Sequence, residues 1–147
     1  MNYDEATTKV IAQMKGTYTD TVIDYAINTR NFGRLADWDG IGTASSSCGE
    51  TIQMWIKVAG GKISKASFET DGCAATLACG SMAAEMITGK DVAGALKITQ
   101  KAILDALGGL PDHNQELALV AAKAVKNAIR DFLALKREPW KKAYRKL

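Results

Sequence analysis

Histidine and cysteine are scarce in this sequence. Its 147 residues contain one histidine, His113, and three cysteines, Cys48, Cys73 and Cys79, which form no CxxC pair. A closed zinc site of the usual Cys/His type would need all four of these residues together, so none is expected. Because a cysteine nucleophile needs a base, we expect no cysteine-dependent enzyme, and we place His113 on the surface beside a helix start.

Long apolar runs and a secretory signal are also missing. The longest uncharged run, Gly72–Ala84, is interrupted by Gly and Ser and is too short to cross a bilayer. The first residues include Asp4 and Glu5 and have no apolar stretch behind them, so no signal peptide is expected. Three cysteines without a signal do not make a disulfide framework. We therefore expect a cytoplasmic protein with reduced thiols and no membrane partner.

Positive charge is concentrated near the C-terminus. Residues 126–147 contain eight Lys or Arg and two Asp or Glu, whereas residues 1–125 contain eleven and fourteen. Such a tail is either a solvated helix end or a segment that touches an acidic surface. Nucleic acid is not favoured, because the tail is short and its only aromatic residues are Phe132, Trp140 and Tyr144.

The first third of the chain predicts two helices and a loop. Residues 3–15 place Tyr3, Val10, Ile11 and Met14 near one helical face. A second helix over about residues 20–28 is expected to be capped by Thr17 or Thr19. The stretch 36–50 is rich in Gly, Ser and Asp, which predicts mostly loop and turn.

The middle of the chain predicts a hairpin and a buried helix. Residues 51–59 alternate, which indicates a half-buried strand with Trp55 on the face opposite Ile52, Met54, Ile56 and Val58. Gly60-Gly61 is a hairpin signal, and a second strand is expected at about 62–70. Residues 74–88 are small and apolar on nearly all sides, as in a buried helix.

The last third predicts three helices. Two short ones are expected at 91–97 and 98–107. A long helix is expected to open at Pro111 and Asp112, with Gln115 completing a capping box, and its apolar stripe extends to Leu135. The fold class is α+β, with a small antiparallel sheet and helices packed on one face. We expect one domain over residues 1–147, with a helical extension (1–16) and a basic tail (137–147).

Two cysteines stand where a ligand is expected. Cys48 lies in a loop, and Gly49 allows the backbone to turn so that Cys48 and Glu50 converge as half of a soft-metal site. Cys73 directly precedes a helix, where backbone N–H groups and the helix dipole favour the thiolate; the alternative is a small buried hydrophobe. Cys79 lies six residues further along, on another side of the helix, and is expected in the core.

Several motifs together give a family resemblance. They are Cys48-Gly49-Glu50, Asp71-Gly72-Cys73, Met86 to Lys90, residues 68–82 (FETDGCAATLACGSM), Asp39 to Gly42, and the earlier Tyr18, Asp20, Val22, Asp24, Asn28, Arg30-Asn31 and Gly33. Over about residues 18–132 the chain resembles the IscU/NifU-type family of iron–sulfur cluster assembly scaffolds. The resemblance implies a non-enzymatic scaffold that receives sulfur from a cysteine desulfurase, gathers iron and passes a labile cluster to recipient apoproteins.

The resemblance also implies ligands. Cys48 and Cys73 correspond to two of the family's three cysteines, and Glu50 stands for the aspartate that keeps the cluster labile. The family's His-Cys pair falls on Glu116 and Leu117, so the third cysteine is missing, as is the family's chaperone-recognition stretch. Thr29 replaces a proline, Tyr25 a histidine, and Cys79 a serine. Cys48, Glu50, Cys73 and Glu116 still form a tetrahedral set that suits zinc or ferrous iron.

Three functions remain open at this point. The first is a scaffold that binds iron or a [2Fe–2S] cluster, with a homodimer bridged by the cluster supplying four cysteines. The second is a zinc-bound persulfide acceptor, in which Cys48 or Cys73 takes over sulfur reception. The third is a partner-binding module that docks through the basic tail, which contains Lys136, Arg137, Lys141, Lys142, Arg145 and Lys146.

Overall fold

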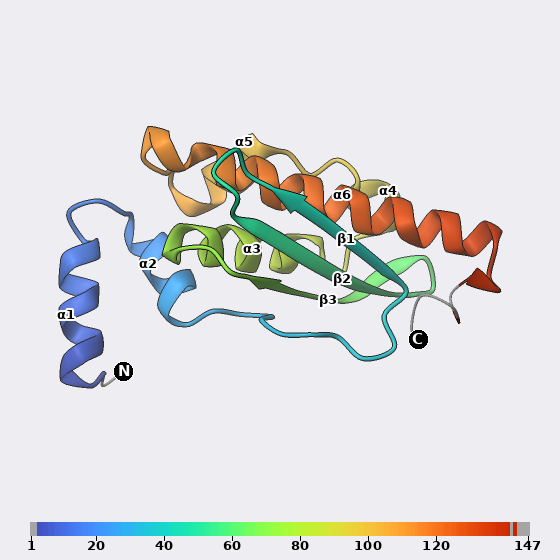
Figure 1. The fold of residues 1–147 in the computed structure, drawn as a ribbon, viewed down its shortest axis with the longest axis horizontal. Coiled ribbons are helices and arrows are strands. Elements are labelled where there is room, and N and C mark those ends of the chain that lie inside the picture. The colour runs from blue at the N-terminus through green and yellow to red at the C-terminus, as the bar shows by residue number, and fades with distance from the viewer. Residues whose placement is uncertain (1–2, 142, 144–147) are drawn as a thin grey trace.

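The computed structural model describes residues 3–141 and 143, and its architecture is the predicted α+β fold. Three antiparallel strands in the order β1-β2-β3 form one sheet, and helices cover one of its faces (Figure 1). The elements are α1 (Glu5–Met14), α2 (Asp20–Ile27), β1 (Gly40–Ser45), β2 (Thr51–Ala59), β3 (Lys62–Thr70), α3 (Ala74–Ile87), α4 (Val92–Ala95), α5 (Gln100–Leu107), a 3-10 turn η1 (Asp112–Asn114) and α6 (Gln115–Arg137).

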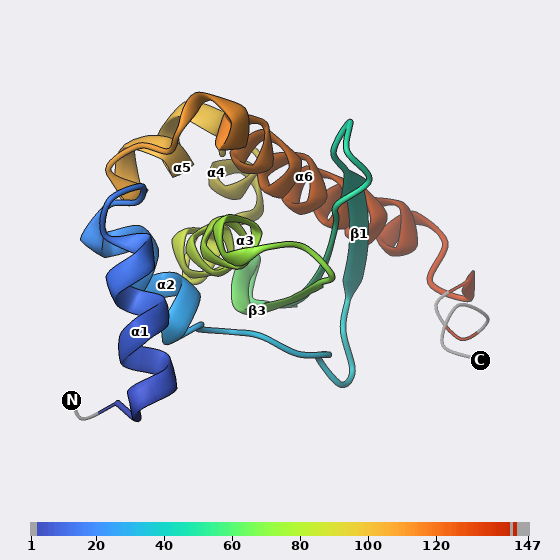
Figure 2. The ribbon, with the colours of Figure 1, turned by 60° about the vertical axis from the view of Figure 1, so that its left-hand side comes forward.

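The N-terminal helices lie at one end of the molecule (Figure 2). Asp4 caps α1 and Thr19, rather than Thr17, caps α2 by accepting a hydrogen bond from the Val22 N–H at 3.1 Å. Met14 of α1 joins Ile23 and Ala26 in a small apolar cluster. Val10, which the sequence grouped with Met14 near one helical face, is not buried with it, since Val10 is 45% exposed. Helix α1 is short and contacts its neighbours on one narrow side, which leaves Val10 in solvent.

Strand β1 corrects the prediction of loop and turn over residues 36–50. Its two glycines signalled a turn, but they serve a close approach between β1 and α6. A Cβ on Gly42 would collide with backbone atoms of α6 and lie 2.7 Å from the Asn127 carbonyl carbon. The outer edge of β1 is also covered by α6, because the Ile41 N–H donates to Asp131 at 2.9 Å and Asn127 Nδ2 donates to the Thr43 carbonyl at 3.0 Å.

Strands β2 and β3 form the predicted hairpin. Ala59 pairs with Lys62, and Gly60 and Gly61 both have positive φ, at 59° and 76°, as the two-residue turn requires. The prediction of a half-buried strand is wrong at Trp55, which is only 1% exposed. The connection between α2 and β1 lies beside this face, with the Arg34 guanidinium 6.0 Å from the centre of the Trp55 ring.

The same connection covers the outer edge of β3. The Gly33 N–H donates to the Phe68 carbonyl at 2.8 Å, and the Phe68 N–H donates to the Asn31 carbonyl at 3.0 Å. Figure 1 shows this segment running along the β3 side of the sheet. Backbone groups that would otherwise offer a place for another strand are therefore occupied at this edge too.

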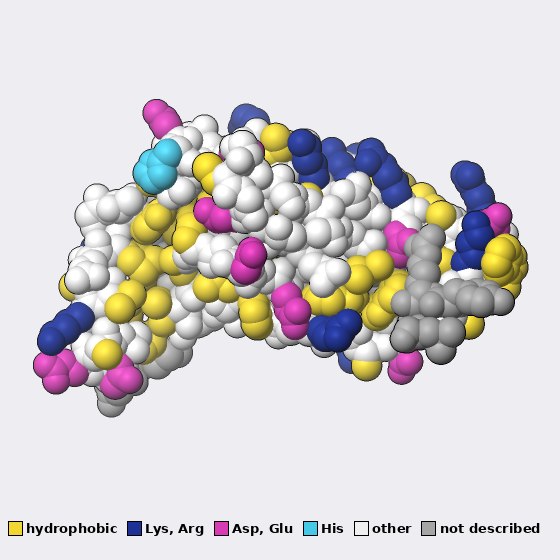
Figure 3. Space-filling model, in the orientation of Figure 1, with side chains coloured by type: hydrophobic (Ala, Val, Ile, Leu, Met, Phe, Trp, Pro, Cys, Tyr) yellow, Lys and Arg dark blue, Asp and Glu magenta, His cyan; other side chains and the backbone are white. Residues whose placement is uncertain are grey.

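Helices α3 and α6 form most of the core against the sheet. Gly80 of α3 lies on Phe68, since a Cβ there would come within 2.5 Å of the ring. The predicted apolar stripe of α6 is buried, apart from the partly buried Phe132. Exposed Lys and Arg side chains gather along the outer side of α6 (Figure 3).

Some helix boundaries differ from the predictions. Helix α4 is shorter than 91–97, and α5 begins at Gln100 because Thr99 caps it by accepting from the Ala102 N–H. The predicted capping box is wrong. Residues Asp112–Asn114 form a 3-10 turn, and the Gln115 side chain turns back toward the Leu110 carbonyl and Asp112. None of the helices in the described part of the chain is both long and apolar enough to cross a membrane.

Candidate metal and cluster site

The predicted site residues come from three segments that lie at one end of the sheet. Cys48 and Glu50 lie in the loop between β1 and β2, Cys73 directly precedes α3, and Glu116 is in the first turn of α6. The side chains of Cys48 and Cys73 are exposed, whereas Cys79 is buried. Both candidate sulfur ligands are therefore open to solvent and to a partner.

Ser46 shapes the loop that carries Cys48. Its hydroxyl oxygen accepts hydrogen bonds from the Cys48 N–H at 3.2 Å and from the Glu50 N–H at 3.1 Å. Its own N–H donates to the Glu50 carbonyl at 2.7 Å, which closes the turn. Gly49 has φ 91°, a left-handed conformation that other residues rarely adopt. The Cys-Gly-Glu sequence therefore forms a tight turn that brings Glu50 toward α3.

Glu50 reaches Cys73 across that turn. The Cys73 Sγ and Glu50 Oε2 atoms are 3.8 Å apart, and Thr76 in the first turn of α3 donates a short hydrogen bond to the same carboxylate oxygen. The Thr76 hydroxyl also lies 3.5 Å from Cys73 Sγ. Cys73 is the N-cap residue of α3, but its side chain makes no capping hydrogen bond. The sulfur is thus left available beside a fixed carboxylate.

Gly72 makes this approach possible. A Cβ at this position would lie 2.5 Å from Thr76 Oγ1 and 2.8 Å from Glu50 Oε2. Sequence reasoning missed the role of Thr76. Its spacing of three residues after Cys73, which places both in the first turn of the helix, was the available signal.

Glu116 has a different partner from the one predicted for it. Its two carboxylate oxygens accept hydrogen bonds from the Ser47 N–H and the Ser47 hydroxyl, both at 2.7 Å. The hydroxyl contact first, and then the backbone contact, hold the pKa of Glu116 below its usual value. Ser47 was not singled out from the sequence, because one residue in a run of three serines carries no pattern of its own.

Cys79 occupies the core, as predicted. Burial raises the pKa of its thiol to about 12, with smaller contributions from the charges of Cys73 and Glu50. Leu117 is buried as well, with 4% of its surface exposed. Neither residue supplies an accessible third sulfur at this end of the sheet.

Within residues 3–141 and 143, no three His, Cys, Asp or Glu side chains are already grouped to hold a metal. The structure brings Glu50 to Cys73 and holds Glu116 against Ser47 in the neighbouring loop. The single histidine, His113, is on the surface beside the start of α6, as expected (Figure 3). The site is therefore a set of donors from three neighbouring segments rather than a closed cage.

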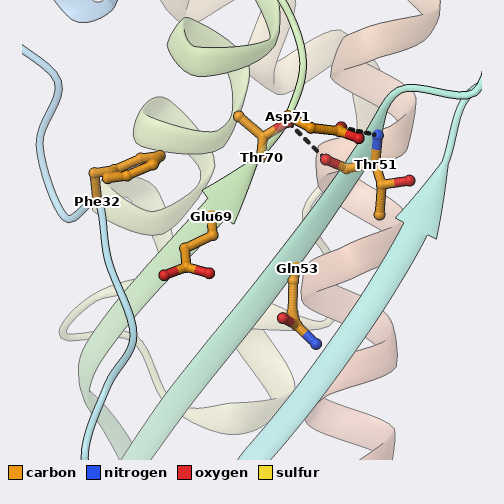
Figure 4. A pocket seen from close by; sticks show the side chains of 6 residues that line it. All are labelled: Phe32, Thr51, Gln53, Glu69, Thr70 and Asp71. Atoms are coloured by element: carbon orange, nitrogen blue, oxygen red, sulfur yellow. Dashed lines mark hydrogen bonds between the residues drawn. The ribbon is translucent and has the colours of Figure 1, made fainter.

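A cavity of about 360 Å³ adjoins the site on the outer face of the sheet. It is lined by Phe32, Thr51, Gln53, Glu69, Thr70 and Asp71 (Figure 4). The Thr51 N–H donates to Asp71 Oδ1 at 3.1 Å, and the Thr70 hydroxyl donates to the Thr51 carbonyl at 2.6 Å. These bonds join the base of the Cys48 loop to the segment that leads into Cys73.

Comparisons with known proteins agree with this fold. The model of the NifU-like N terminal domain family matches residues 17–138. The chain belongs to this family, the IscU/NifU-type scaffolds of iron–sulfur cluster assembly. It is 44% identical over 116 residues to the iron–sulfur cluster assembly scaffold protein IscU 1 of Archaeoglobus fulgidus, a match that covers 78% of this chain and 76% of that protein.

One further relative supports the family, and one solved structure supports the fold. The IscU scaffold protein of Aquifex aeolicus is 35% identical over 123 residues, with 82% of this chain and 78% of that protein covered. The crystal structure of FiSufU from Fervidobacterium islandicum superposes with a TM-score of 0.64 at 20% identity, over 76% of this chain and 96% of that one, and supports the fold alone. The predicted fold and the predicted role as a scaffold rather than an enzyme are confirmed.

Proposed function

We propose that this scaffold holds iron or a labile [2Fe–2S] cluster through Cys48 and Cys73, with Glu50 as an oxygen donor. The observation that carries the proposal is the 3.8 Å separation between Cys73 Sγ and Glu50 Oε2 at a solvent-exposed turn. Thiolates are soft ligands for iron, whereas a carboxylate is harder and holds a sulfide-bridged cluster more weakly. A mixed set of this kind suits cargo that is bound briefly and then released.

Glu116 remains a prediction as the fourth ligand. Both of its oxygens accept hydrogen bonds from Ser47, so binding to a metal competes with those contacts. One chain therefore offers two exposed thiolates and one nearby carboxylate, which is fewer thiolates than the four that usually hold such a cluster. We propose that two copies, each contributing Cys48 and Cys73, complete the set as a homodimer bridged by the cluster.

The cargo also implies partners. A cysteine desulfurase would supply sulfur as a persulfide, and recipient apoproteins would remove the cluster. Because Leu117 is buried and has no sulfur, Cys48 or Cys73 would accept the incoming persulfide. Both are exposed, as such a transfer requires. The cytoplasmic location expected from the sequence belongs to the same proposal.

The test is anaerobic reconstitution with iron and sulfide, followed by visible absorption, iron and acid-labile sulfide analysis, and mass measurement. The wild type should take up iron and sulfide and become coloured, whereas Cys48→Ser and Cys73→Ser should each lose most of the bound sulfide. Cys79→Ala is the matched control and should load like the wild type, because Cys79 is buried in the core. A colourless monomer in the wild-type sample would contradict the proposal.

Zinc is the second candidate cargo. Cys48, Cys73 and the Glu50 carboxylate are also acceptable zinc donors, and a zinc-held thiolate beside Glu50 could receive a persulfide. Zinc analysis combined with a persulfide-trapping reagent separates this function from the first. Zinc at one equivalent, with sulfur trapped on Cys48 or Cys73 and no cluster absorption, would favour it.

The partner-binding alternative rests on the basic tail. Lys136, Arg137 and Lys141 lie in the described part of the chain, whereas Lys142, Arg145 and Lys146 lie outside it. Deletion of residues 137–147 should then abolish capture of an acidic partner and leave metal content unchanged. Unaltered capture by the shortened chain would reject this alternative.

A further inference from the structure

The contact between Ser47 and Glu116 links two parts of the chain that are 69 residues apart in sequence. Glu116 is in the first turn of α6, which is fixed to the core through Leu117 and Ala118. Ser47 is the residue directly before Cys48. A carboxylate on a rigid helix thus receives two hydrogen bonds from the neighbour of a candidate ligand.

The other hydrogen bonds of this loop join different groups. Ser46 closes the turn internally, through the Cys48 and Glu50 N–H groups. Glu50 is held at α3 by Thr76, and Thr51 is held by Asp71 at the end of β3. The Cys48 side of the loop is therefore joined to the helical layer by Glu116, and the Glu50 side by Thr76.

We propose that Glu116 is a positioning residue that latches the Cys48 loop to α6 in the metal-free protein. This inference rests on the proposed function, since it assigns Glu116 to the presentation of Cys48 rather than to direct coordination. Charge-assisted hydrogen bonds are stronger than neutral ones, and a backbone N–H together with the adjacent hydroxyl fits the two oxygens of one carboxylate. The latch holds Cys48 in one place relative to Cys73 before cargo arrives.

The decisive comparison is between Glu116→Gln and Glu116→Ala. Glutamine keeps an acceptor for the Ser47 N–H and gains a donor for the Ser47 hydroxyl, so it preserves both contacts while removing the negative charge. Alanine removes both contacts. Asp112→Ala is the matched control, because it removes a nearby carboxylate that accepts a hydrogen bond from the Gln115 side chain rather than from Ser47.

The first measurement uses metal-free, reduced protein. Alkylation of Cys48 by iodoacetamide is followed by mass spectrometry with Cys73 as the internal reference, and hydrogen–deuterium exchange is followed over residues 46–50. Glu116→Ala should change the Cys48 rate severalfold and increase exchange in the loop by about tenfold, with the Cys73 rate unchanged. Ser47→Ala should show a smaller effect in the same direction, and the double variant should match Glu116→Ala.

The second measurement is iron uptake by the same variants. A latch predicts near wild-type uptake in Glu116→Gln, whereas a ligand role predicts that Glu116→Gln loses uptake as severely as Glu116→Ala. Unchanged Cys48 reactivity and loop exchange in Glu116→Ala would overturn the latch. If wild-type protein takes up no iron but the metal-free effects are present, the proposed function fails while the latch stands.

Discussion

At the scale of the residue, Gly72 controls whether Glu50 can approach Cys73. The Gly72→Ala substitution places a Cβ 2.5 Å from Thr76 Oγ1, so the Thr76 or Glu50 side chain must move. We expect a loss of about 1–3 kcal/mol in the free energy of unfolding and weaker iron uptake. Urea denaturation and iron titration measure the two effects.

Gly16→Ala is the control for that experiment. Apart from its two chain neighbours, Gly16 has no atom of the described residues within 4 Å of the position of a Cβ, and its φ is not in the left-handed region. Its stability should be unchanged or slightly higher, because alanine has less conformational freedom in the unfolded chain. Equal iron uptake by wild type and Gly72→Ala would show that the Glu50–Cys73 approach has no part in binding.

Cys79 provides a second prediction for a single residue. Its thiol is buried and its pKa is raised to about 12, so at pH 8 it should resist alkylation while Cys48 and Cys73 react. All three should react after unfolding in urea, which is the control. Reaction of Cys79 at the rate of Cys73 in the folded protein would contradict its place in the core.

The same shift predicts a dependence of stability on pH. Because the pKa of the thiol is raised in the folded state, the unfolded thiol ionises from about its ordinary pKa of 9.0 while the folded thiol stays protonated. The contribution of Cys79 to stability is therefore complete below pH 9 and is lost as the pH rises from there toward 12. Cys79→Ala should lack this part of the alkaline decline in urea denaturation curves.

At the scale of the element, the packing of β1 against α6 depends on Gly42. Gly42→Ala would drive a methyl group into the backbone of α6, which cannot rotate away as a side chain could. We expect a loss of about 3 kcal/mol or more, or failure to fold. Circular dichroism and urea denaturation provide the measurement, and Gly16→Ala again serves as control. A stability equal to that of the wild type would mean that β1 and α6 lie further apart.

The sheet shows which elements could be predicted from the sequence and which could not. The alternation of residues 51–59 and the Gly60-Gly61 turn predicted the hairpin, because both signals are local. Strand β1 was missed, since Gly40 and Gly42 read as turn residues until α6, 80 or more positions away, lies against them. Trp55 was placed on an open face for a similar reason, because the segment beside it comes from residues 31–35.

The residues of the candidate site also fall into two groups, those that the sequence predicted and those that it did not. Cys48, Glu50 and Cys73 could be selected from motif and position, and their proximity to one end of the sheet follows from the order of the elements. Thr76 and Ser47 could not, because their roles depend on the rotation of α3 and on the first turn of α6. A serine in a run of three carries no sign of a long-range contact, and the spacing of Thr76 from Cys73 signalled only a shared helical turn, not the contact with Glu50.

At the scale of the whole molecule, cluster loading should change the number of chains in the particle. If two copies share one cluster, the mass should rise from 15.7 kDa to about twice that value on anaerobic reconstitution. Size-exclusion chromatography with light scattering measures the change, and removal of the cluster by a chelator should restore the smaller particle. A loaded protein that stays at the mass of one chain would require all ligands to come from a single copy.

The covered sheet edges have a consequence for how such a pair could form. Asn127 and Asp131 occupy the β1 edge, and Asn31 and Gly33 occupy the β3 edge, so neither side is free to recruit a strand from another molecule. Dimerisation would then depend on the cluster bound between the exposed thiols, not on backbone hydrogen bonds between strands of the two chains. Transfer of the cluster to a recipient would dissociate the dimer and leave two folded chains that can bind a cluster again.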